Sequence, residues 1–240
     1  MTGRVVAIMQ ARMSSSRLPG KVLHPLCGRP MFLRQIERLR RCKMIDEIIV
    51  ATSTGPEDGA IADACISEGI PCFRGSLTDV LDRYHEAAAF AGNPTHVVRL
   101  TADCPLADPE VIDACIDLHL RSAADYTSNT IERHFPKGLD VEVMTANALE
   151  TAWREGTSAY DREHVTPYLY GHPEQFRLET LKADFDRGDW RWTVDTAADM
   201  EVVEAVYQAL YETNPAFDTD DVIAFLKRNA EIAGLNGALG

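Results

Sequence analysis

The sequence has no excess of positive charge and no long apolar run. Lys and Arg number 24 against 37 Asp and Glu, which gives a formal net charge of −13 at pH 7. Proteins that bind nucleic acids depend largely on Lys and Arg to neutralise phosphates, so this balance argues against a nucleic-acid partner. No segment has the length of a membrane span or of a signal-peptide core. We therefore expect a cytoplasmic protein with neither nucleic acid nor a membrane as a partner.

Several common site motifs are also missing. No G-x-G-x-x-G follows the first apolar run, and Gly20-Lys21 lacks the earlier glycine of a Walker A loop, so neither a dinucleotide fold nor a P-loop is indicated. The 6 cysteines form no C-x-x-C pair and are expected to be reduced and packed. The 7 histidines show no ligand spacing, which argues against zinc. A phosphate or metal site in this chain would therefore have to be built from residues outside these common motifs.

Short apolar runs alternate with amphipathic stretches along the whole chain, which predicts an α/β fold with a single doubly wound, mainly parallel sheet. A chain of 240 residues fits one domain, residues 1–240. The expected strands cover residues 5–9, 47–53, 70–73, 96–103, 125–129, 139–145, 177–182 and 191–194. The expected helices cover residues 31–41, 58–68, 78–91, 109–121, 146–155, 158–170, 196–212 and 219–233.

The stretch Val5–Leu23 (VVAIMQARMSSSRLPGKVL) organises the rest of the chain. A buried strand leads into a loop with three serines, a Pro-Gly turn and the cations Arg12, Arg17 and Lys21. The turn lets the backbone double back and point its N–H groups inward, which suits a chain of phosphates. The alternative is an ordinary strand-to-helix connection with solvated cations. Right-handed crossovers place such a loop at the carboxyl edge of the sheet, where ligands bind.

The positive charges are concentrated near the start of the chain. Residues 1–43 contain 10 Lys or Arg and the single acid Glu37, so an anionic small ligand is expected at this end. Arg34, Arg38 and Arg41 follow helical spacing, and we interpret them as a solvated helix face.

Asp103 and Asp195 each follow an apolar run directly. On a parallel sheet, both carboxylates would lie at the carboxyl edge beside the cationic loop. Two hard oxygen ligands facing phosphates favour magnesium, which bridges carboxylates to phosphate oxygens. The alternatives are a helix cap for Asp195 and a turn before Cys104-Pro105 for Asp103.

A second group of polar residues follows later in the chain. Residues 131–138 (IERHFPKG) break all periodicity, which predicts a loop over the site. Asp140 and Glu142 share one face of the next strand, where they are candidate ligands for a metal or for substrate hydroxyls; a solvated face is the alternative. His134 and His164 are candidate substrate contacts, with solvated histidines as the alternative.

The chain contains the motifs ARMSSSRLPGK at residues 11–21, VAT at 50–52, DCPL at 103–106 and VDTAADME at 194–201, together with the segments LPGKVL, RLTADCPL, GLDVEV, EHVTPY and RWTVDT. Taken together, these motifs resemble the CMP-sugar-acid synthetases, which include the CMP-KDO synthetases and the acylneuraminate cytidylyltransferases. The likeness extends over nearly the whole chain and is greatest to the branch named after the spore coat polysaccharide biosynthesis protein SpsF, of which the five segments are typical.

This resemblance implies a nucleotidyltransferase of glycosyltransferase-A-like topology that uses CTP and Mg²⁺. It would transfer CMP to an anionic sugar with release of pyrophosphate, for surface polysaccharide or glycoconjugate biosynthesis. Arg12 and Lys21 would hold the triphosphate and Asp103 and Asp195 the metal, and these four are the expected catalytic residues. The expected nucleotide contacts are Ala11, Arg12, Met13, Ser14, Ser15, Ser16, Lys21, Arg74, Gly75, Ser76, Thr101 and Asp103.

The acceptor is expected to differ from KDO, because the acceptor-recognition segments of the KDO enzymes are not recognisable between Arg133 and Lys182. Residues 130–182 are expected to form an acceptor-binding and dimerisation subregion. The resemblance implies a homodimer, with residues 138–143 (GLDVEV) and the following helix as its interface. The candidate acceptor contacts are Arg133, His134, Lys137, Asp140, Glu142, Tyr160, Arg162 and His164.

Two other functions stay open at this point. A glycosyltransferase that uses a nucleotide sugar shares the same topology, although the Arg-rich serine loop suits a free triphosphate better. A noncatalytic nucleotide-binding subunit is the second alternative, and the presence of both Asp103 and Asp195 argues against it.

Overall fold

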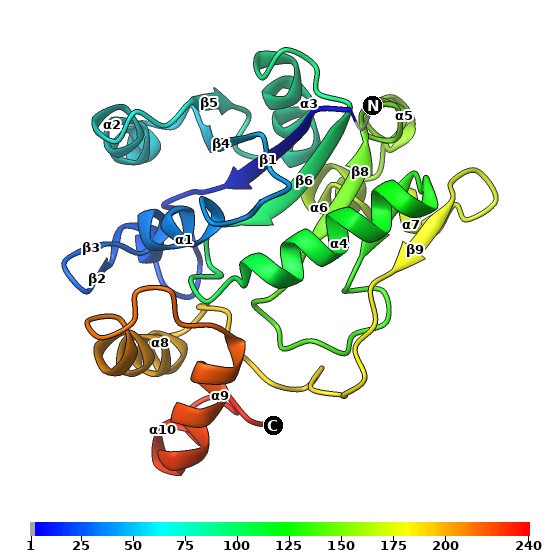
Figure 1. Ribbon diagram of the computed structural model, residues 1–240. Helices are drawn as coiled ribbons and strands as arrows, with labels where there is room; N and C mark the ends of the chain where they lie inside the picture. Colours follow the sequence, from blue (N-terminus) through cyan, green and yellow to red (C-terminus); the bar gives the residue numbers. More distant parts are fainter. Residues whose placement is uncertain (1–2) are drawn as a thin grey trace.

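The computed structural model describes residues 3–240 and contains a seven-stranded sheet with helices on both faces (Figure 1). The strands are β1 (Val5–Gln10), β4 (Glu47–Ser53), β5 (Cys72–Gly75), β6 (His96–Thr101), β7 (Tyr126–Ser128), β8 (Glu142–Thr145) and β9 (Leu178–Thr180), beside a separate hairpin of β2 (Pro25–Leu26) and β3 (Arg29–Pro30). The strand order is β5-β4-β1-β6-β8-β7-β9. Only β8 runs antiparallel to its neighbours within this sheet, so the predicted mainly parallel α/β sheet is confirmed.

The helices are α1 (Met31–Leu39), α2 (Gly59–Ser67), α3 (Val80–Phe90), α4 (Pro109–Ser122), α5 (Ala146–Glu155), α6 (Ala159–His164), α7 (Pro167–Gly171), α8 (Ala197–Leu210), α9 (Thr219–Arg228) and α10 (Ala230–Ala233), with 3-10 turns η1 (Lys21–Leu23) and η2 (Pro56–Asp58). In Figure 1, α1 and α4 cover one face of the sheet, α3 and α5 the other, and α8 to α10 form a group at one end. None of the helices within residues 3–240 is both long enough and apolar enough to cross a membrane.

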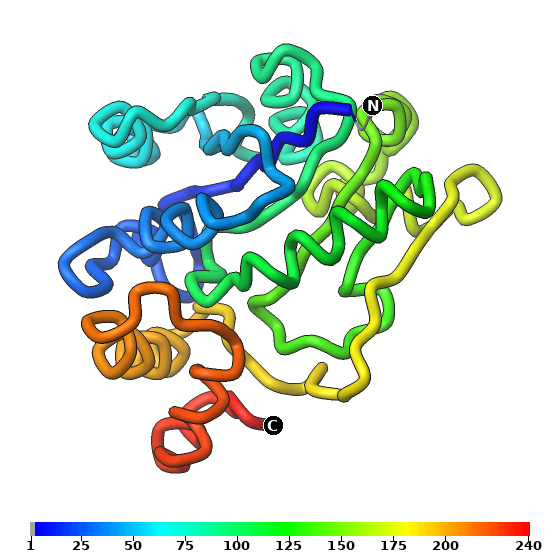
Figure 2. Tube along the Cα trace, viewed as in Figure 1, coloured from blue at the N-terminus to red at the C-terminus, as the bar shows by residue number. Residues whose placement is uncertain are grey.

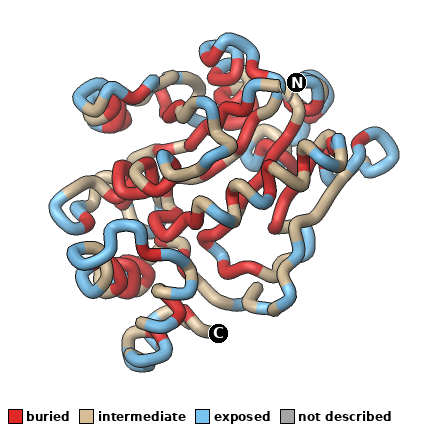
Figure 3. Tube along the Cα trace, viewed as in Figure 1, coloured by how far each residue is buried: buried red, intermediate tan, exposed pale blue. Residues whose placement is uncertain are grey.

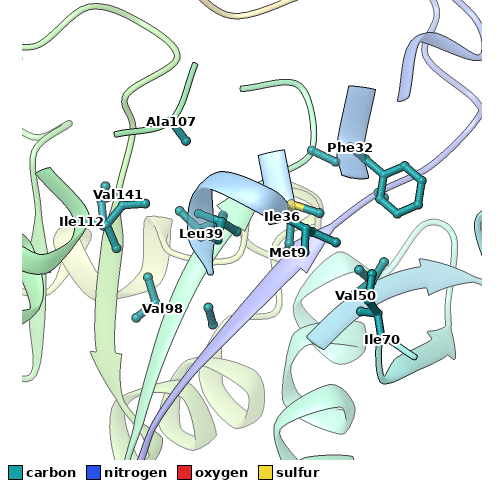
Figure 4. Packing of buried hydrophobic residues seen from close by; sticks show 14 of the residues in the cluster. Met9, Phe32, Ile36, Leu39, Val50, Ile70, Val98, Ala107, Ile112 and Val141 are labelled. Carbon is teal, nitrogen blue, oxygen red and sulfur yellow. The ribbon is translucent and has the colours of Figure 1, made fainter. Parts of the chain in front are cut away.

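The core is built from the two faces of β1, because successive strand residues point to opposite sides. Met9 belongs to the cluster under α1 and α4, where Ile36, Leu39 and Ile112 pack on the sheet (Figure 4). Ile8 belongs to the cluster on the other face, under α3 and α5. The sheet is therefore buried on both sides, which explains the continuous apolar runs of its parallel strands.

A third cluster joins the C-terminal helices to the sheet. Trp192 is fully buried in it, and its indole N–H donates to the Ala238 carbonyl oxygen at 2.8 Å. In Figure 2 the red C-terminal end of the tube lies beside α10, far from the N-terminal end of the chain. Figure 3 shows buried residues on the side of α8 that faces the rest of the molecule and more exposed residues on its opposite side. This packing fixes the segment that carries Asp195.

The arginines of α1 correct one prediction. Arg34 and Arg38 are 8% and 2% exposed, so they do not form a solvated face. Arg38 Nε donates to the Ala107 carbonyl oxygen at 2.7 Å, and its guanidinium carbon lies 4.4 Å from the centre of the Phe217 ring. Both arginines lie between α1 and the C-terminal part of the chain, where they act as structural cations and not as ligand contacts.

Three predicted elements differ from the structure. Residues 191–194 form no strand and contribute only an isolated bridge between Lys137 and Arg191. The helix predicted over residues 158–170 is broken into α6 and α7 at Val165, which has φ of 75° and precedes Thr166-Pro167. The positive φ of Val165 ends α6, and Pro167 begins α7 at a position where its missing N–H has no helical partner to lose. The last predicted helix is divided into α9 and α10 at Asn229.

His119 should make folding stability depend on pH. It is fully buried, bonds to Thr127 Oγ1 at 3.0 Å and to His96 Nδ1 at 3.1 Å, and burial with repulsion from His96 lowers its pKa to about 4. Between this pKa and about 6.5 only the unfolded chain takes up the proton, so stability is lost as the pH falls. We expect the free energy of unfolding to be about 2 kcal/mol lower at pH 5 than at pH 7.

Urea denaturation of the wild type and of His119→Gln at pH 5 and pH 7 measures this contribution. The glutamine has no titrating group, so its stability should change less between the two pH values. An equal change in both proteins would show that His119 is not the source of the pH dependence.

Candidate active site

The cationic loop and Asp103 meet where two neighbouring parallel strands end. β1 and β6 pair with Gln10 opposite Thr101, so the loop of residues 11–20 and the segment after Thr101 leave the sheet side by side. The Ala102 N–H donates to the Gln10 carbonyl oxygen at 2.8 Å, which extends this pairing by one residue. Gly20 adopts a φ of 75°, a conformation that glycine takes without strain, and returns the loop to Lys21.

Lys21 lies at the centre of the site. Its Nζ donates to Asp103 Oδ2 and Asp195 Oδ1, each at 3.0 Å, and to the Val194 carbonyl oxygen at 2.6 Å. Burial alone would lower the pKa of Lys21, but attraction to Asp103 and Asp195 outweighs burial and raises it. The lysine is therefore charged and ties together carboxylates from distant parts of the chain.

Asp195 reaches the site without a strand to carry it. The Val194 N–H donates to the Asp103 carbonyl oxygen at 2.8 Å, which fixes the two aspartates next to each other. Asp195 Oδ2 accepts a hydrogen bond from Arg191 Nη2 at 2.8 Å and forms an ion pair with Arg17 at 3.0 Å. Burial would raise the pKa of Asp195, but Lys21, Arg191 and Arg17 together lower it. The carboxylate therefore stays ionised at neutral pH.

A polar cavity of about 170 Å³ opens between the loop and these carboxylates. It is lined by Gln10, Arg12, Ser15, Ser16, Arg17, Lys21, Val22, Thr101, Ala102, Asp103 and Asp195. Six of the expected nucleotide contacts are in this lining: Arg12, Ser15, Ser16, Lys21, Thr101 and Asp103. Arg12 forms no side-chain hydrogen bond or ion pair with any of residues 3–240, so its charge is available to a ligand.

The other expected nucleotide contacts lie outside this lining. Ala11 is buried, and the Met13 N–H donates to Asp58 Oδ1 at 2.7 Å, which holds the loop to η2. Ser14 lines a neighbouring cavity together with Ser53, Gly55 and Leu77.

The segment Arg74-Gly75-Ser76 lines neither this neighbouring cavity nor the first one. Arg74 Nε donates to the Ser53 carbonyl oxygen at 2.9 Å and Arg74 Nη2 to the Gly55 carbonyl oxygen at 2.8 Å. The side chain of Arg74 therefore braces the ends of β4 and β5 instead of pointing freely into a ligand space. Gly75 has no room for a side chain, because a Cβ there would lie 2.8 Å from Phe73.

A second, larger cavity of about 400 Å³ lies on the other side of the two aspartates. It shares Thr101, Asp103 and Asp195 with the first cavity. Six of the expected acceptor contacts line it: Arg133, Lys137, Asp140, Glu142, Tyr160 and His164. The structure thus brings most of the expected acceptor contacts together in one cavity, although they come from residues 133–140, β8 and α6.

Most charges of the second cavity are already paired. Arg133 forms two bonds to Asp140, of 2.5 and 3.1 Å. Glu142 is buried and accepts from Arg99, from Tyr126 Oη at 2.6 Å and from Thr166 Oγ1 at 2.6 Å. Lys137, in contrast, forms no side-chain hydrogen bond or ion pair within residues 3–240, which leaves its ammonium group for a ligand.

Two predicted acceptor contacts do not line the cavity. His134 Nδ1 lies 3.2 Å from the Phe185 carbonyl oxygen, outside the lining. Arg162 Nε and Nη2 donate to Asp79 Oδ2 at 2.8 and 2.6 Å, and Nη1 donates to the Trp153 carbonyl oxygen at 2.7 Å. Arg162 therefore has a structural role that links α6 to the start of α3, because all of these donors are used within the chain.

The predicted dimer segment is mostly internal. Strand β8 pairs with β6 on one side and β7 on the other, and Leu139, Val141 and Val143 are buried in this chain. Their side chains are unavailable to a second copy. The exposed positions of α5 are the part of the predicted interface that could reach a partner.

The family follows from comparison with known proteins. A family model described as "Cytidylyltransferase" matches residues 6–217. The chain belongs to this cytidylyltransferase family. The match includes the loop, both aspartates and both cavities, so the geometry described above is that of a family member.

Individual relatives agree with this assignment. The spore coat polysaccharide biosynthesis protein SpsF of Bacillus subtilis is 36% identical over 236 residues, which are 95% of this chain and 96% of that protein. A 3-deoxy-manno-octulosonate cytidylyltransferase of Nitratidesulfovibrio vulgaris is 41% identical over 113 residues, 45% of this chain and 43% of that protein. The structure of a cytidylyltransferase from Leptospira borgpetersenii has a TM-score of 0.89 at 31% identity and covers 95% of this chain and 96% of that chain.

The residues that could hold a metal in this cytidylyltransferase are few. Within residues 3–240, no three His, Cys, Asp or Glu side chains are grouped so that they could hold an ion. Asp103 and Asp195 do converge, since both lie within 3.0 Å of the same Lys21 nitrogen. One or two carboxylates are what magnesium commonly takes from a protein when substrate phosphates supply further oxygens. The pair therefore fits an ion that arrives with phosphates.

Sequence reasoning missed Arg191, which lines the second cavity and holds Asp195 and Asp199. Its spacing of four residues from Asp195 was a usable signal, although such spacing usually indicates a helix surface. It also missed Thr166 and Tyr170, which line the second cavity. The expected helix over residues 158–170 did not indicate which of its faces would meet that cavity.

Proposed function

We propose that the protein transfers CMP from CTP to a sugar acid and releases pyrophosphate. The observation that supports this most is the position of Asp103 and Asp195 on the wall shared by two cavities. One cavity carries the cationic loop and suits a triphosphate, and the other carries a free ammonium group and suits an anionic acceptor. A reaction between the two ligands would take place beside the aspartates.

The triphosphate is assigned to the first cavity. Arg12 is free there, Arg17 and Lys21 add further positive charge, and the hydroxyls of Ser15 and Ser16 provide donors. Charged donors fixed in position stabilise the charge that develops on the phosphate oxygens without reorganising during the reaction. The neighbouring cavity lined by Ser14, Ser53 and Leu77 is the proposed place for the nucleoside.

The chemical step is an in-line displacement at the α-phosphorus of CTP. An acceptor hydroxyl oxygen forms the new bond to phosphorus, the bond to the β-phosphate bridging oxygen breaks, and pyrophosphate leaves while the hydroxyl proton passes to solvent. Arg12 and Lys21 hold the leaving phosphates, and the second cavity directs the hydroxyl toward the aspartates. A Mg²⁺ ion held by Asp103 and Asp195 would supply additional charge stabilisation when bound.

A panel of nucleotides tests the proposal first. Thermal unfolding with CTP, UTP, ATP, GTP, CDP-sugars or UDP-sugars, each with and without Mg²⁺, shows which ligand binds the native state. We expect a Mg²⁺-dependent stabilisation by CTP, followed by pyrophosphate release when a suitable sugar acid is added. Stabilisation by a nucleotide sugar and by no triphosphate would contradict the proposal and favour a glycosyltransferase.

Lys137 is the proposed anchor for the acceptor's negative charge. Replacing it with alanine should raise the KM for the sugar acid about tenfold while the KM for CTP stays unchanged, because Lys137 lines only the second cavity. Initial rates of pyrophosphate release at varied acceptor and CTP measure both constants. Lys182→Ala is the matched control, since Lys182 pairs with Glu132 and lines neither cavity. An unchanged acceptor KM in Lys137→Ala would remove this assignment.

We further propose that the enzyme is a cytoplasmic homodimer that serves surface polysaccharide or glycoconjugate biosynthesis. The polysaccharide assignment is supported by the name of the SpsF relative, whereas the homodimer and the location rest on the sequence resemblance and composition alone. Light scattering of the purified chain measures its mass in solution, and a strictly monomeric mass would exclude the dimer.

A further inference from the structure

Lys21 has no N–H group left for a phosphate in the arrangement described above. An ammonium group has three N–H donors and no acceptor. Its three partners are Asp103 Oδ2, Asp195 Oδ1 and the Val194 carbonyl oxygen. One cation therefore occupies both carboxylates that are the candidate metal ligands, and a phosphate can bind Lys21 only if some of these contacts are given up.

The three oxygens around Nζ are also suitable ligands for a divalent cation. Carboxylate and carbonyl oxygens are the hard donors that such ions prefer. The Lys21 ammonium group and a divalent ion bound to the same oxygens would repel each other. Solvent screens this repulsion poorly because the Lys21 side chain is only 8% exposed. The ammonium group and a free divalent ion therefore exclude one another from these oxygens.

Both carboxylate oxygens of each aspartate already have partners within the chain. The second oxygen of Asp103 accepts from Thr101 Oγ1 at 2.6 Å, and the second oxygen of Asp195 accepts from Arg191 and is ion-paired with Arg17. A free ion that displaced Lys21 would leave a buried ammonium group without an anionic partner, which is costly. A triphosphate in the first cavity removes this cost, because Lys21 lines that cavity.

We propose that Lys21 competes with the divalent cation for Asp103 and Asp195, so that the site takes up the cation together with a triphosphate and not alone. The ammonium group moves from the carboxylates to the phosphates as the cation replaces it, and no covalent bond changes. The inference rests on the proposed function to the extent that a triphosphate binds in the first cavity.

Binding of Mn²⁺ to the protein without nucleotide tests the competition, with electron paramagnetic resonance as the readout. Lys21→Met keeps a side chain of similar length and removes the charge. We expect it to bind Mn²⁺ about tenfold more tightly than the wild type does, within the usual range of couplings between sites. Lys227→Met, which removes an exposed charge on α9, should bind Mn²⁺ as the wild type does. Lys21→Met combined with Asp195→Asn should lose the gain.

Addition of CTP gives the second part of the test. CTP should tighten Mn²⁺ binding about tenfold or more in the wild type and clearly less in Lys21→Met, because the variant has no ammonium group to displace. Equal Mn²⁺ affinity of the nucleotide-free wild type and Lys21→Met would overturn the competition. If CTP does not bind at all, the proposed function fails, whereas the nucleotide-free comparison still decides the competition.

A measurement on the wild type covers the case in which Lys21→Met does not fold. In protein labelled with ¹³C at lysine Cε, the NMR signal of Lys21 is identified by its loss in Lys21→Arg. Mg²⁺ alone should leave this signal in place, and Mg²⁺ with CTP should shift it. A shift produced by Mg²⁺ alone, of the same size as with CTP, would overturn the inference.

Discussion

Replacing Asp195 with alanine is expected to slow CMP transfer by about 100-fold or more. This is the scale of loss when one preorganised charged group is removed from an active site. Asp195 lies on the wall between both cavities, accepts hydrogen bonds from Lys21 and Arg191, and is ion-paired with Arg17. Its removal leaves three cations without their shared partner and takes away one of two candidate metal ligands. Pyrophosphate release at saturating CTP and acceptor measures the effect.

Asp195→Asn is the companion variant, because it keeps the shape of the side chain and removes only the charge. Lys21→Ala should lose turnover on the same scale, since it removes the cation that contacts both aspartates. Circular dichroism spectra and thermal unfolding of each variant show whether the fold is intact. Near-normal transfer by a folded variant would exclude that residue from the mechanism.

Replacing Trp192 with alanine should lower the free energy of unfolding by about 3–5 kcal/mol, the usual cost of truncating a large buried aromatic side chain. Trp192 is fully buried, and its N–H donates to the Ala238 carbonyl oxygen. Its backbone N–H donates to the Lys137 carbonyl oxygen at 2.7 Å, so the same residue holds the segment that leads to Asp195. Urea denaturation followed by circular dichroism measures the loss.

Two matched variants separate the contributions of Trp192. Trp192→Phe keeps most of the apolar volume and loses the indole hydrogen bond, so we expect a loss of about 1–2 kcal/mol. Trp190→Ala removes a neighbouring ring that is only partly buried and should cost less than Trp192→Ala. Equal losses at Trp190 and Trp192 would mean that the third cluster does not depend on the buried indole.

The position of the cationic loop beside Asp103 could be predicted from the sequence because its parts are local. A strand, a serine loop with cations and a Pro-Gly turn follow one another within residues 5–23, and Asp103 follows the neighbouring strand. Parallel strands bring their carboxyl ends to one edge whatever the details of packing. The position of the loop beside Asp103 therefore needed only the order of the elements.

The acceptor side could be predicted only in part. Six of its eight expected residues line the second cavity, but His134 contacts the Phe185 carbonyl oxygen and Arg162 bonds to Asp79 instead. Residue type indicated a binding role for both, whereas the direction of each side chain depends on neighbours far along the chain. Asp79 takes up the guanidinium group of Arg162, and no local pattern around residue 162 indicates that partner.

The sequence by itself determined the α/β sheet, the cationic loop and the family, because hydrophobic periodicity and short motifs act over a few residues. The tertiary structure alone decided how Asp195 reaches the site, since the strand expected at residues 191–194 does not form. Asp195 is positioned instead by the packing of Trp192 and by the hydrogen bond from the Val194 N–H to the Asp103 carbonyl oxygen. The tertiary structure also decided that Lys21 joins both aspartates. Contacts across 82 and 174 residues depend on the packing of the whole chain, which local sequence does not encode.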